Sequence, residues 1–399
     1  MRRSRDRLAP SALGSCGRSV VSVDRVAEAF SSIGGPPRVH LWERPAPGAE
    51  RQLSAELSLP EWSDLWSIYG LATADDLVAH QLWRNFQARA DLIIHEKVGA
   101  DWETTTLPLP PEDPFIRFGQ ITAVAGDQVL TLTARTINLP VKVRVVQRTA
   151  NGWEDVQLLR LPDLRATWFE NPSKIVQADG VAVVTASFSP SAAVAICERD
   201  TAGVWAQTAL LSQPAPNAWS TDVAVAPSGD RVALAWQSRS STGQEQVVVE
   251  IHERAAGGSG SPWTLAQSLT VPLPSSLWSA IAFDGDRLAV SNFDTVYTFE
   301  RSSSGDLVQG ADIAGILRPS GFSGNELIGI TQRATAAVDV PSGSATVQLC
   351  SLAGLVTCPP GGAATLRVHD THSVAGRRAA AEIVAADPGA TVLLFRSAE

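Results

Sequence analysis

The hydrophobic positions of this chain fall into short runs that recur at a nearly constant distance. In residues 280–301, AIAFDGDRLAVSNFDTVYTFER, a short apolar run is followed by Gly-Asp, a second apolar run, a loop and a third run that ends in Glu-Arg. Short runs rich in β-branched and aromatic residues are typical of strands, and Gly-Asp is typical of a tight hairpin turn. The stretch therefore predicts three strands joined by short connections.

The same arrangement recurs eight times along the chain. Successive units are separated by 52, 51, 52, 51, 56, 39 and 52 residues. A period of this length indicates an array of equal supersecondary units. The residues at the turn between the first two strands of each unit are Asp24, Asp76, Asp127, Asp179, Asp230, Asp286, Asn325 and Arg377.

Each unit is expected to hold a fourth strand, and its first three strands lack a consistent polar face. A sheet that is apolar on both sides must be covered on both sides. Copies of the same sheet, packed face to face around an axis, provide that cover. The sequence therefore predicts one closed, all-β propeller over residues 18–399. The direct count is eight four-stranded blades, and seven is the alternative if the first or the irregular seventh unit is not a blade.

Tryptophan opens the fourth strand in several units. Burial of such a side chain contributes at most roughly 4–6 kcal/mol, and a large residue at a fixed position of a repeat is expected to pack between blades. These packing tryptophans are Trp102, Trp153, Trp205 and Trp263.

Two segments, FGQITAVAGDQVLTLTA (118–134) and WSAIAFDGDRLAVSN (278–292), resemble the FG-GAP repeats of integrin-α-like β-propellers. The resemblance extends over nearly the whole chain and implies an exported protein that binds other molecules. Two family features are missing, namely Gly-Ala-Pro after the second strand and the Asp-x-Asp-x-Asp-Gly calcium loop. Asp284 and Asp286 are interpreted as turn residues, because calcium needs several oxygen ligands in one loop. No cofactor is therefore expected.

Composition excludes several classes of protein. The 399 residues are 44% apolar, which suffices for a large core, and carry a formal net charge of -9. An acidic chain is not expected to bind nucleic acid, which requires a basic face. No apolar run approaches the ~18 residues of a membrane-spanning helix. No nucleophile elbow, P-loop or dinucleotide fingerprint is present, so no catalytic residue is assigned.

The four cysteines lead to different expectations. Cys350 and Cys358 flank SLAGLVT within the seventh unit, and a hairpin there would allow a disulfide. Such a bridge implies an oxidising compartment, and the alternative is two unrelated thiols. Cys197 lies in a third-strand pattern and is expected to be a buried small hydrophobic residue.

Residues 1–17 are interpreted as an N-terminal tail or a degenerate export signal. Leu13-Gly14-Ser15-Cys16 resembles a bacterial lipobox, and a lipid on Cys16 would anchor the chain to a membrane surface. The preceding segment is short, contains proline and is poorly apolar for a signal peptide, so an ordinary tail is the alternative.

Two tryptophans that match no repeat position form the candidate ligand face. Trp62 and Trp168 lie in connections between the fourth strand of one unit and the first strand of the next. Exposed aromatics can stack on sugars or anchor a protein partner; the alternative is a plug for the central channel. His95 and His252 share one position of the repeat, which indicates a structural role for both.

These features lead to one main functional prediction and two alternatives. The main prediction is an exported, non-enzymatic module that binds a protein or a glycan through one propeller face, located outside the cell or in its envelope. The alternatives are an enzyme, a lyase or hydrolase acting at the central channel, and a structural scaffold of the envelope. A cytoplasmic location stays open as well.

Overall fold

The computed structural model describes residues 18–368 with several gaps. The gaps are residues 22–24, 31–37, 44–51, 59–65, 75, 85–88, 109–121, 134–139, 166–173, 187–192, 216–217, 240–243, 256–257, 259, 273–278, 293–294, 315–317, 324–325, 331–334, 340–345 and 349–365. The expected eighth unit, residues 372–399, lies outside the described residues.

The described strands form seven sheets, and the four main strands of each sheet pair antiparallel in chain order. The first three sheets consist of β1 (Arg18–Val21), β2 (Arg25–Phe30), β3 (Arg38–Glu43) and β4 (Gln52–Ser58); β5 (Trp66–Ala74), β6 (Leu77–Arg84), β7 (Arg89–Val98) and β8 (Asp101–Pro108); and β9 (Thr122–Ala125), β10 (Gln128–Thr133), β11 (Pro140–Thr149) and β12 (Gly152–Arg165).

The fourth to seventh sheets follow the same order. They consist of β13 (Lys174–Ala178), β14 (Val181–Ala186), β15 (Ala193–Arg199) and β16 (Trp205–Ser212); β17 (Trp219–Val225), β18 (Arg231–Arg239), β19 (Glu245–Arg254) and β20 (Trp263–Pro272); β21 (Ile281–Phe283), β22 (Arg287–Ser291), β23 (Thr295–Arg301) and β24 (Leu307–Ala314); and β25 (Arg318–Ser323), β26 (Glu326–Ile330), β27 (Thr335–Asp339) and β29 (Leu366–Val368). In addition, β28 (Thr346–Gln348) pairs parallel with β24 at the outer edge of the sixth sheet.

The turns between first and second strands have the predicted chemistry. Gly126, Gly180, Gly229 and Gly285 all have positive φ, between 58° and 100°. Glycine reaches this region without the steric penalty of a Cβ atom. At Gly229 a Cβ would also lie 3.0 Å from the carbonyl oxygens of Ala178 and Asp179, so the turn of the fifth sheet approaches the backbone of the fourth.

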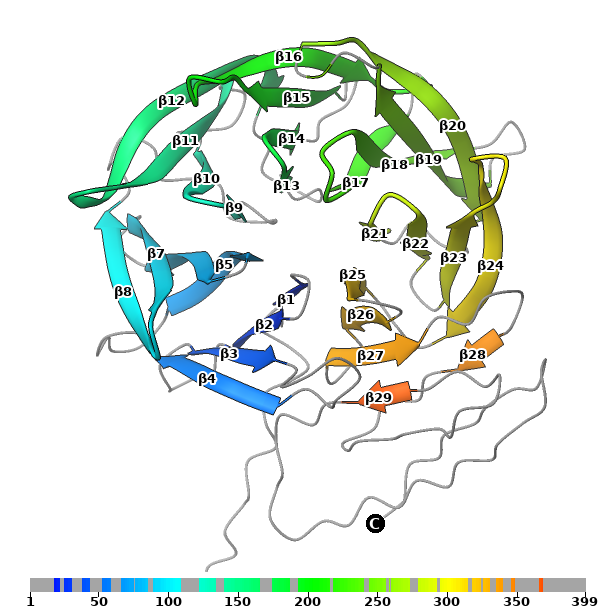
Figure 1. Ribbon diagram of the computed structural model, residues 1–399. Coiled ribbons are helices and arrows are strands. Elements are labelled where there is room, and N and C mark those ends of the chain that lie inside the picture. The colour runs from blue at the N-terminus through cyan, green and yellow to red at the C-terminus, as the bar shows by residue number, and fades with distance from the viewer. Residues whose placement is uncertain are drawn as a thin grey trace, which may run out of the picture.

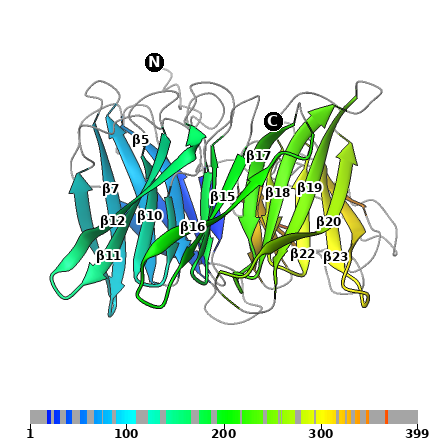
Figure 2. The same cartoon turned by 90° about the horizontal axis from the view of Figure 1, so that it is seen from above.

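The sheets are arranged around a common axis (Figure 1). The first strand of each sheet lies nearest the axis and the fourth lies at the rim. The side view shows the strands running along that axis (Figure 2). Strand β1 contacts β25 and β26, so the first and seventh sheets are neighbours in space. The all-β prediction is confirmed, and the described residues form seven sheets with four antiparallel strands each in chain order. Because the expected eighth unit lies outside the described residues, the closed ring and the choice between seven and eight blades stay predictions.

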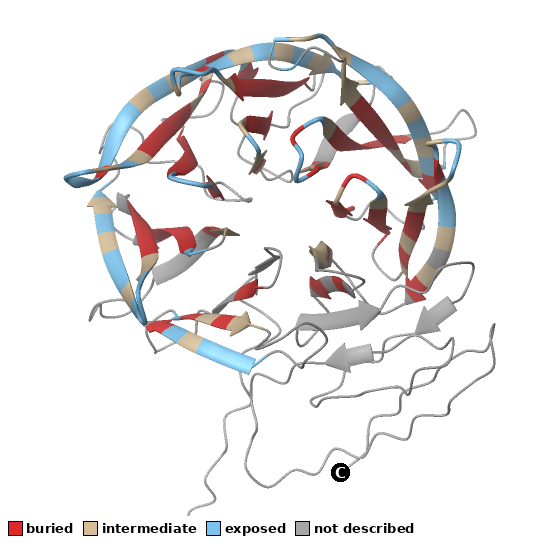
Figure 3. Cartoon of the chain, viewed as in Figure 1, coloured by how far each residue is buried: buried red, intermediate tan, exposed pale blue. Residues whose placement is uncertain are grey.

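The core lies between neighbouring sheets. Buried residues concentrate on the inner three strands and exposed residues on the outermost strand (Figure 3). Five apolar clusters fill the successive junctions from the first to the sixth sheet. The expectation that both faces are covered is therefore confirmed for the second to fifth sheets, each of which contributes to two of these clusters.

The recurrent tryptophans lie in these junctions, as predicted. Each packs against the sheet that precedes its own in the chain. In the sixth sheet Leu307 takes the same position and is buried against the fifth sheet. The tryptophans with their preceding sheets are Trp102 on the first, Trp153 on the second, Trp205 on the third and Trp263 on the fourth.

Candidate functional site

The turns between first and second strands lie at one end of the sheets, which we call the turn end. The third strand also ends there, and a Lys or Arg at or next to its last residue donates its backbone N–H to a turn carbonyl in its own sheet. The five bonds are 2.8–2.9 Å long and join Lys97 to Asp76, Arg148 to Asp127, Arg199 to Gly180, Arg254 to Asp230 and Arg301 to Asp286.

Each of these five cations also forms an ion pair with an acid of the preceding sheet. Glu198 and Glu253 each receive a cation from the next sheet, while the arginine that follows each of them reaches the previous sheet. The Glu-Arg ending of the third strand thus links three sheets. The pairs, which we call the turn-end belt, are Lys97–Glu43 (3.9 Å), Arg148–Glu96 (2.7 Å), Arg199–Asp127 (3.4 Å), Arg254–Glu198 (3.9 Å) and Arg301–Glu253 (3.1 Å).

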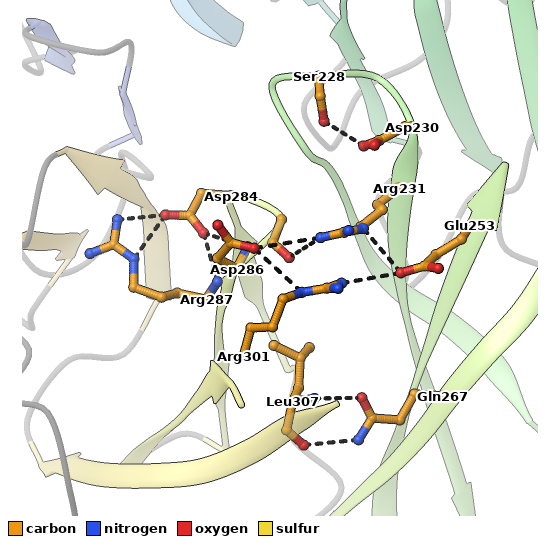
Figure 4. A network of polar contacts seen from close by, with 11 residues as sticks. Ser228, Asp230, Arg231, Glu253, Gln267, Asp284, Asp286, Arg287, Arg301 and Leu307 are labelled. Carbon is orange, nitrogen blue, oxygen red and sulfur yellow. Dashed lines mark hydrogen bonds and ion pairs between the residues drawn. The ribbon is translucent and has the colours of Figure 1, made fainter. Parts of the chain in front are cut away.

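The belt is most developed between the fifth and sixth sheets (Figure 4). Arg231 Nε lies 3.0 Å from Glu253, and its Nη1 lies 3.5 Å from Asp286 and donates to the Gly285 carbonyl at 2.9 Å. Arg301 reaches the same two acids at 3.1 and 3.3 Å. Each of these charged side chains lies beside one of opposite charge. We therefore interpret the turn-end belt as a structural link between neighbouring sheets and not as a ligand site.

Asp284 is a turn residue, as the sequence indicated. Its Oδ1 accepts the backbone N–H groups of Asp286 and Arg287 at 3.1 and 2.7 Å, and its Oδ2 accepts from the Arg287 guanidinium at 2.9 and 2.5 Å. This carboxylate therefore closes the turn and holds Arg287, whose guanidinium lies 4.5 Å from the ring centroid of Phe322 in the next sheet.

The opposite end of the sheets, where the innermost strands begin, we call the start end. Lys174 opens β13, and its Nζ donates to Asp222 Oδ1 of β17 at 2.5 Å. Asp222 Oδ2 accepts the N–H of Ile281, the first residue of β21, at 2.8 Å. A β-bulge between Ser220 and Asp222 precedes the carboxylate, and bulges commonly re-aim a side chain at functional sites. One carboxylate thus joins the innermost strands of three successive sheets.

This Lys174–Asp222 pair is sheltered from water, because the side chains are 16% and 10% exposed. Asp222 Oδ1 also accepts the N–H of Val223 at 2.8 Å, so both of its lone pairs are used. Among the described contacts Oδ2 accepts one bond, which leaves a lone pair for a further donor such as water. The ammonium of Lys174 likewise has N–H donors beyond the one given to Asp222.

A second buried polar group lies between the first and second sheets. His80 Nε2 lies 3.2 Å from His95 Nε2, and His95 Nδ1 lies 2.9 Å from Thr104 Oγ1. Burial lowers the pKa of His95 to about 4, and burial together with the charge of His95 lowers that of His80 well below its usual value. Both imidazoles are therefore neutral at pH 7.

His95 and His252 occupy the same position of the repeat, but they have different hydrogen-bond partners. His252 Nε2 lies 3.3 Å from Glu250 Oε2 in its own sheet, far along the chain from the His80–His95 pair. The structural interpretation of this position agrees with these contacts. A comparison of the units with one another does not single out His80, because its contact with His95 lies between two strands of one unit.

The other residues singled out from the sequence have separate outcomes. Cys197 is a buried free cysteine, as predicted, and burial raises the pKa of its thiol to about 12. Trp62 and Trp168, which were to form the ligand face, lie outside the described residues. So do Cys16, Cys350 and Cys358. The ligand face, the lipid anchor and the disulfide therefore stay predictions.

The described part of the chain shows neither a metal-binding cluster nor a membrane-spanning helix. It contains no group of three or more His, Cys, Asp and Glu side chains placed to hold a metal ion. The described elements are all strands, and no helix among the described residues is long and apolar enough to cross a membrane.

Solved structures of known proteins share this fold. The periplasmic gluconolactonase PpgL of Pseudomonas aeruginosa is 11% identical, with a TM-score of 0.52 over 88% of this chain and 96% of that one. A putative 6-phosphogluconolactonase from Bacteroides uniformis is 14% identical, with a TM-score of 0.51 over 75% and 87%. KlAtg21, solved in complex with the coiled coil of AgAtg16, is 12% identical, with a TM-score of 0.54 over 84% and 97%.

Sequence comparisons add no family. No protein-family model matches the chain, and no curated protein sequence matches it. The resemblance to FG-GAP repeats is therefore not confirmed, whereas a propeller-like all-β fold is supported by the structural neighbours.

The comparisons correct the main functional prediction. A non-enzymatic binding module was expected, but the chains that share this fold over most of their length include a gluconolactonase and a putative 6-phosphogluconolactonase. The main prediction was wrong because it relied on the resemblance to FG-GAP repeats and on the absence of a catalytic motif, and the structural neighbours favour its alternative, a hydrolase, instead. A propeller assembles its site from residues of several blades, and such a site leaves no local motif.

Proposed function

We propose that this chain is a propeller enzyme that hydrolyses a sugar lactone at the start end. The observation that carries the proposal is the sheltered Lys174–Asp222 pair, placed where the innermost strands of three sheets begin. The gluconolactonase and the putative 6-phosphogluconolactonase of the same fold supply the substrate class. The proposal also takes the seven sheets as blades of one closed ring, because β1 contacts β25 and β26.

The chemistry of lactone hydrolysis matches what this pair offers. A base removes a proton from water, and the resulting hydroxide oxygen attacks the carbonyl carbon. The ring C–O bond then breaks, and the proton held by the base passes to the leaving ring oxygen, which gives a hydroxy acid. Asp222 Oδ2 has a lone pair for that water, and a positioned base typically contributes 10²–10⁴-fold. The Lys174 ammonium is placed to stabilise the negative charge that develops on the carbonyl oxygen.

Lactone hydrolysis by the purified chain is the direct test. Acid release from glucono-1,5-lactone and from its 6-phosphate is followed with a pH indicator against the spontaneous rate. We expect Asp222→Asn and Lys174→Met each to lower kcat on the order of 100-fold or more. Lys97→Met, which removes the lysine of the turn-end belt, is the matched control and is expected to leave kcat unchanged.

Two outcomes would overturn the proposal. One is a wild-type chain that adds nothing to the spontaneous rate with either lactone. The other is an Asp222→Asn variant that has the same urea unfolding midpoint as the wild type and full activity. Catalysis would then not depend on the Lys174–Asp222 pair.

A further inference from the structure

The two histidines between the first and second sheets form a pair that the proposed function does not use. The imidazole rings are 5.4 Å apart at their centroids and inclined by 32°. His80 and His95 are both 0% exposed. In the antiparallel register His80 is opposite Ile93 and His95 is opposite Val78, so the two rings meet along a diagonal of the same face.

The surroundings of the pair are mainly apolar. Its face of the second sheet packs in one cluster with the first sheet, through residues such as Ala27, Leu41, Val78 and Ile93. An ionised group in such surroundings loses hydration that nothing replaces unless it finds a partner. The pair is therefore stable only while both rings are neutral.

The charged groups on this interface are few. On β7, Asp91 and Lys97 share the face of His95 at alternate positions, and Asp91 is buried. From the first sheet, Arg25 of β2 and Glu43 of β3 form an ion pair at the turn end. Strand β8 contributes the neutral Thr104, strand β4 the apolar Leu57, and β5 the apolar Leu71. The turn contributes Asp76, which lies 3.9 Å from Arg25.

The hydrogen bonds also depend on the neutral state. Because His80 Nε2 faces His95 Nε2 at 3.2 Å, one of these two nitrogens must be an unprotonated acceptor. Full protonation of both rings would place two N–H groups and two positive charges against each other across that distance.

We propose that His80 and His95 form an acid-sensitive latch that holds the first and second sheets together when neutral and releases them when protonated. The release is local, because the pair bridges β6 and β7 at the face that meets the first sheet. An acidic environment would thereby loosen the ring at this junction while the others stay packed.

The direction of the pH dependence follows from the lowered pKa of each ring. The unfolded histidine titrates near 6.5, whereas His95 in the folded chain titrates near 4. Between these values the opened or unfolded state binds more protons than the folded state, so stability falls as pH falls. It is highest above pH 6.5 and declines toward pH 4. Each proton taken up on opening raises the opening equilibrium constant about tenfold per pH unit in this range.

Hydrogen exchange of the full chain tests the latch. Exchange is measured by mass spectrometry at pH 7 and pH 5, corrected for the intrinsic pH dependence, in peptides from β6–β7 and from β14–β15. We expect the opening constant of β6–β7 to rise on the order of tenfold or more while that of β14–β15 changes little. Equal changes in both segments, or none in β6–β7, would refute the latch.

Variants separate the pair from the other groups at this junction. His80→Gln with His95→Gln keeps polar side chains that do not titrate and should abolish the acid-induced opening of β6–β7. His252→Gln, at the same repeat position in the fifth sheet, should leave it intact. A double variant that keeps the full acid response would assign it to other groups at this junction and overturn the proposal. The wild-type comparison of the two segments remains decisive if a variant fails to fold.

Discussion

The junction between the third and fourth sheets and the junction between the fifth and sixth are held by different forces. In the first, Trp205 is 1% exposed and its Nε1 donates to Gln128 Oε1 at 2.8 Å. In the second, Leu307 takes that position and the charges of Figure 4 lie on one side of it at the turn end. The repeat thus tolerates loss of its aromatic anchor where ion pairs are more numerous.

A backbone clamp is common to both junctions. Gln157 donates to the carbonyl of Trp205 at 2.6 Å and accepts its N–H at 2.9 Å. Gln267 makes the same two bonds to Leu307, both at 2.8 Å. Because the glutamine bonds only the main-chain atoms of Trp205 or Leu307, the same backbone contact forms with either side chain. The two junctions therefore share this backbone contact and differ in the side-chain interactions that stabilise them.

The largest effect is expected from Trp205→Ala. Removal of a fully buried aromatic side chain costs about 3–5 kcal/mol, from lost transfer free energy and the remaining cavity. Urea unfolding measures the loss. Trp102→Ala is the matched control, because Trp102 occupies the same repeat position but is only partly buried, and its cost should be smaller. Equal costs would show that burial at this position does not set the strength of a junction.

A smaller loss is expected from Gln128→Leu, which leaves the Trp205 Nε1–H buried without its acceptor. An unsatisfied buried donor costs roughly 1–3 kcal/mol. The cost should nearly vanish in a Trp205→Phe background, which has no N–H to satisfy. A double-mutant cycle by urea unfolding measures this coupling, and a cost that is the same in both backgrounds would contradict it.

The features predicted from the sequence are those that recur at one position of the repeat. The turn residues, the third strands and the tryptophan anchors depend on local chemistry and on the repeat period, so one chain suffices to locate them. The Glu-Arg ending of the third strand was visible too. The ion-pair partners of these residues could not be predicted, because the repeat period does not show whether Arg254 pairs with an acid of the preceding sheet, as it does with Glu198, or of the following one.

The candidate site and the histidine pair could not be predicted for two different reasons. Lys174 and Asp222 are 48 residues apart, slightly less than one repeat, and only the ring arrangement places both at the same end of neighbouring innermost strands. His80 and His95 are close in sequence, but their contact depends on the strand register, in which a shift by one residue would turn them to opposite faces.

A modest, salt-dependent effect is expected from Arg301→Met at the fifth–sixth junction. The side chains of Arg301 and Glu253 are 24% and 38% exposed, and partly exposed ion pairs contribute about 0.2–1 kcal/mol. The loss in urea unfolding should shrink as NaCl rises to about 1 M, where the Debye length is near 3 Å. The cost of Trp205→Ala should not change with salt. A salt-independent loss at Arg301 would mean that its packing and not its charge stabilises the junction.

The smallest effect concerns Cys197, which lies in the same cluster as Trp205 and reports on that junction without altering it. With a thiol pKa of about 12, burial leaves about one thiolate in ten thousand at pH 8. In a Cys16→Ser, Cys350→Ser, Cys358→Ser background, Ellman's reagent should therefore react with the folded chain only at the rate at which the junction opens. Adding Trp205→Ala should speed labelling, whereas Arg301→Met, two junctions away, should not. Faster labelling in the Arg301→Met variant would show that the junctions open together. The third–fourth and fifth–sixth junctions would then differ in the residues that hold them but not in their free energy of opening.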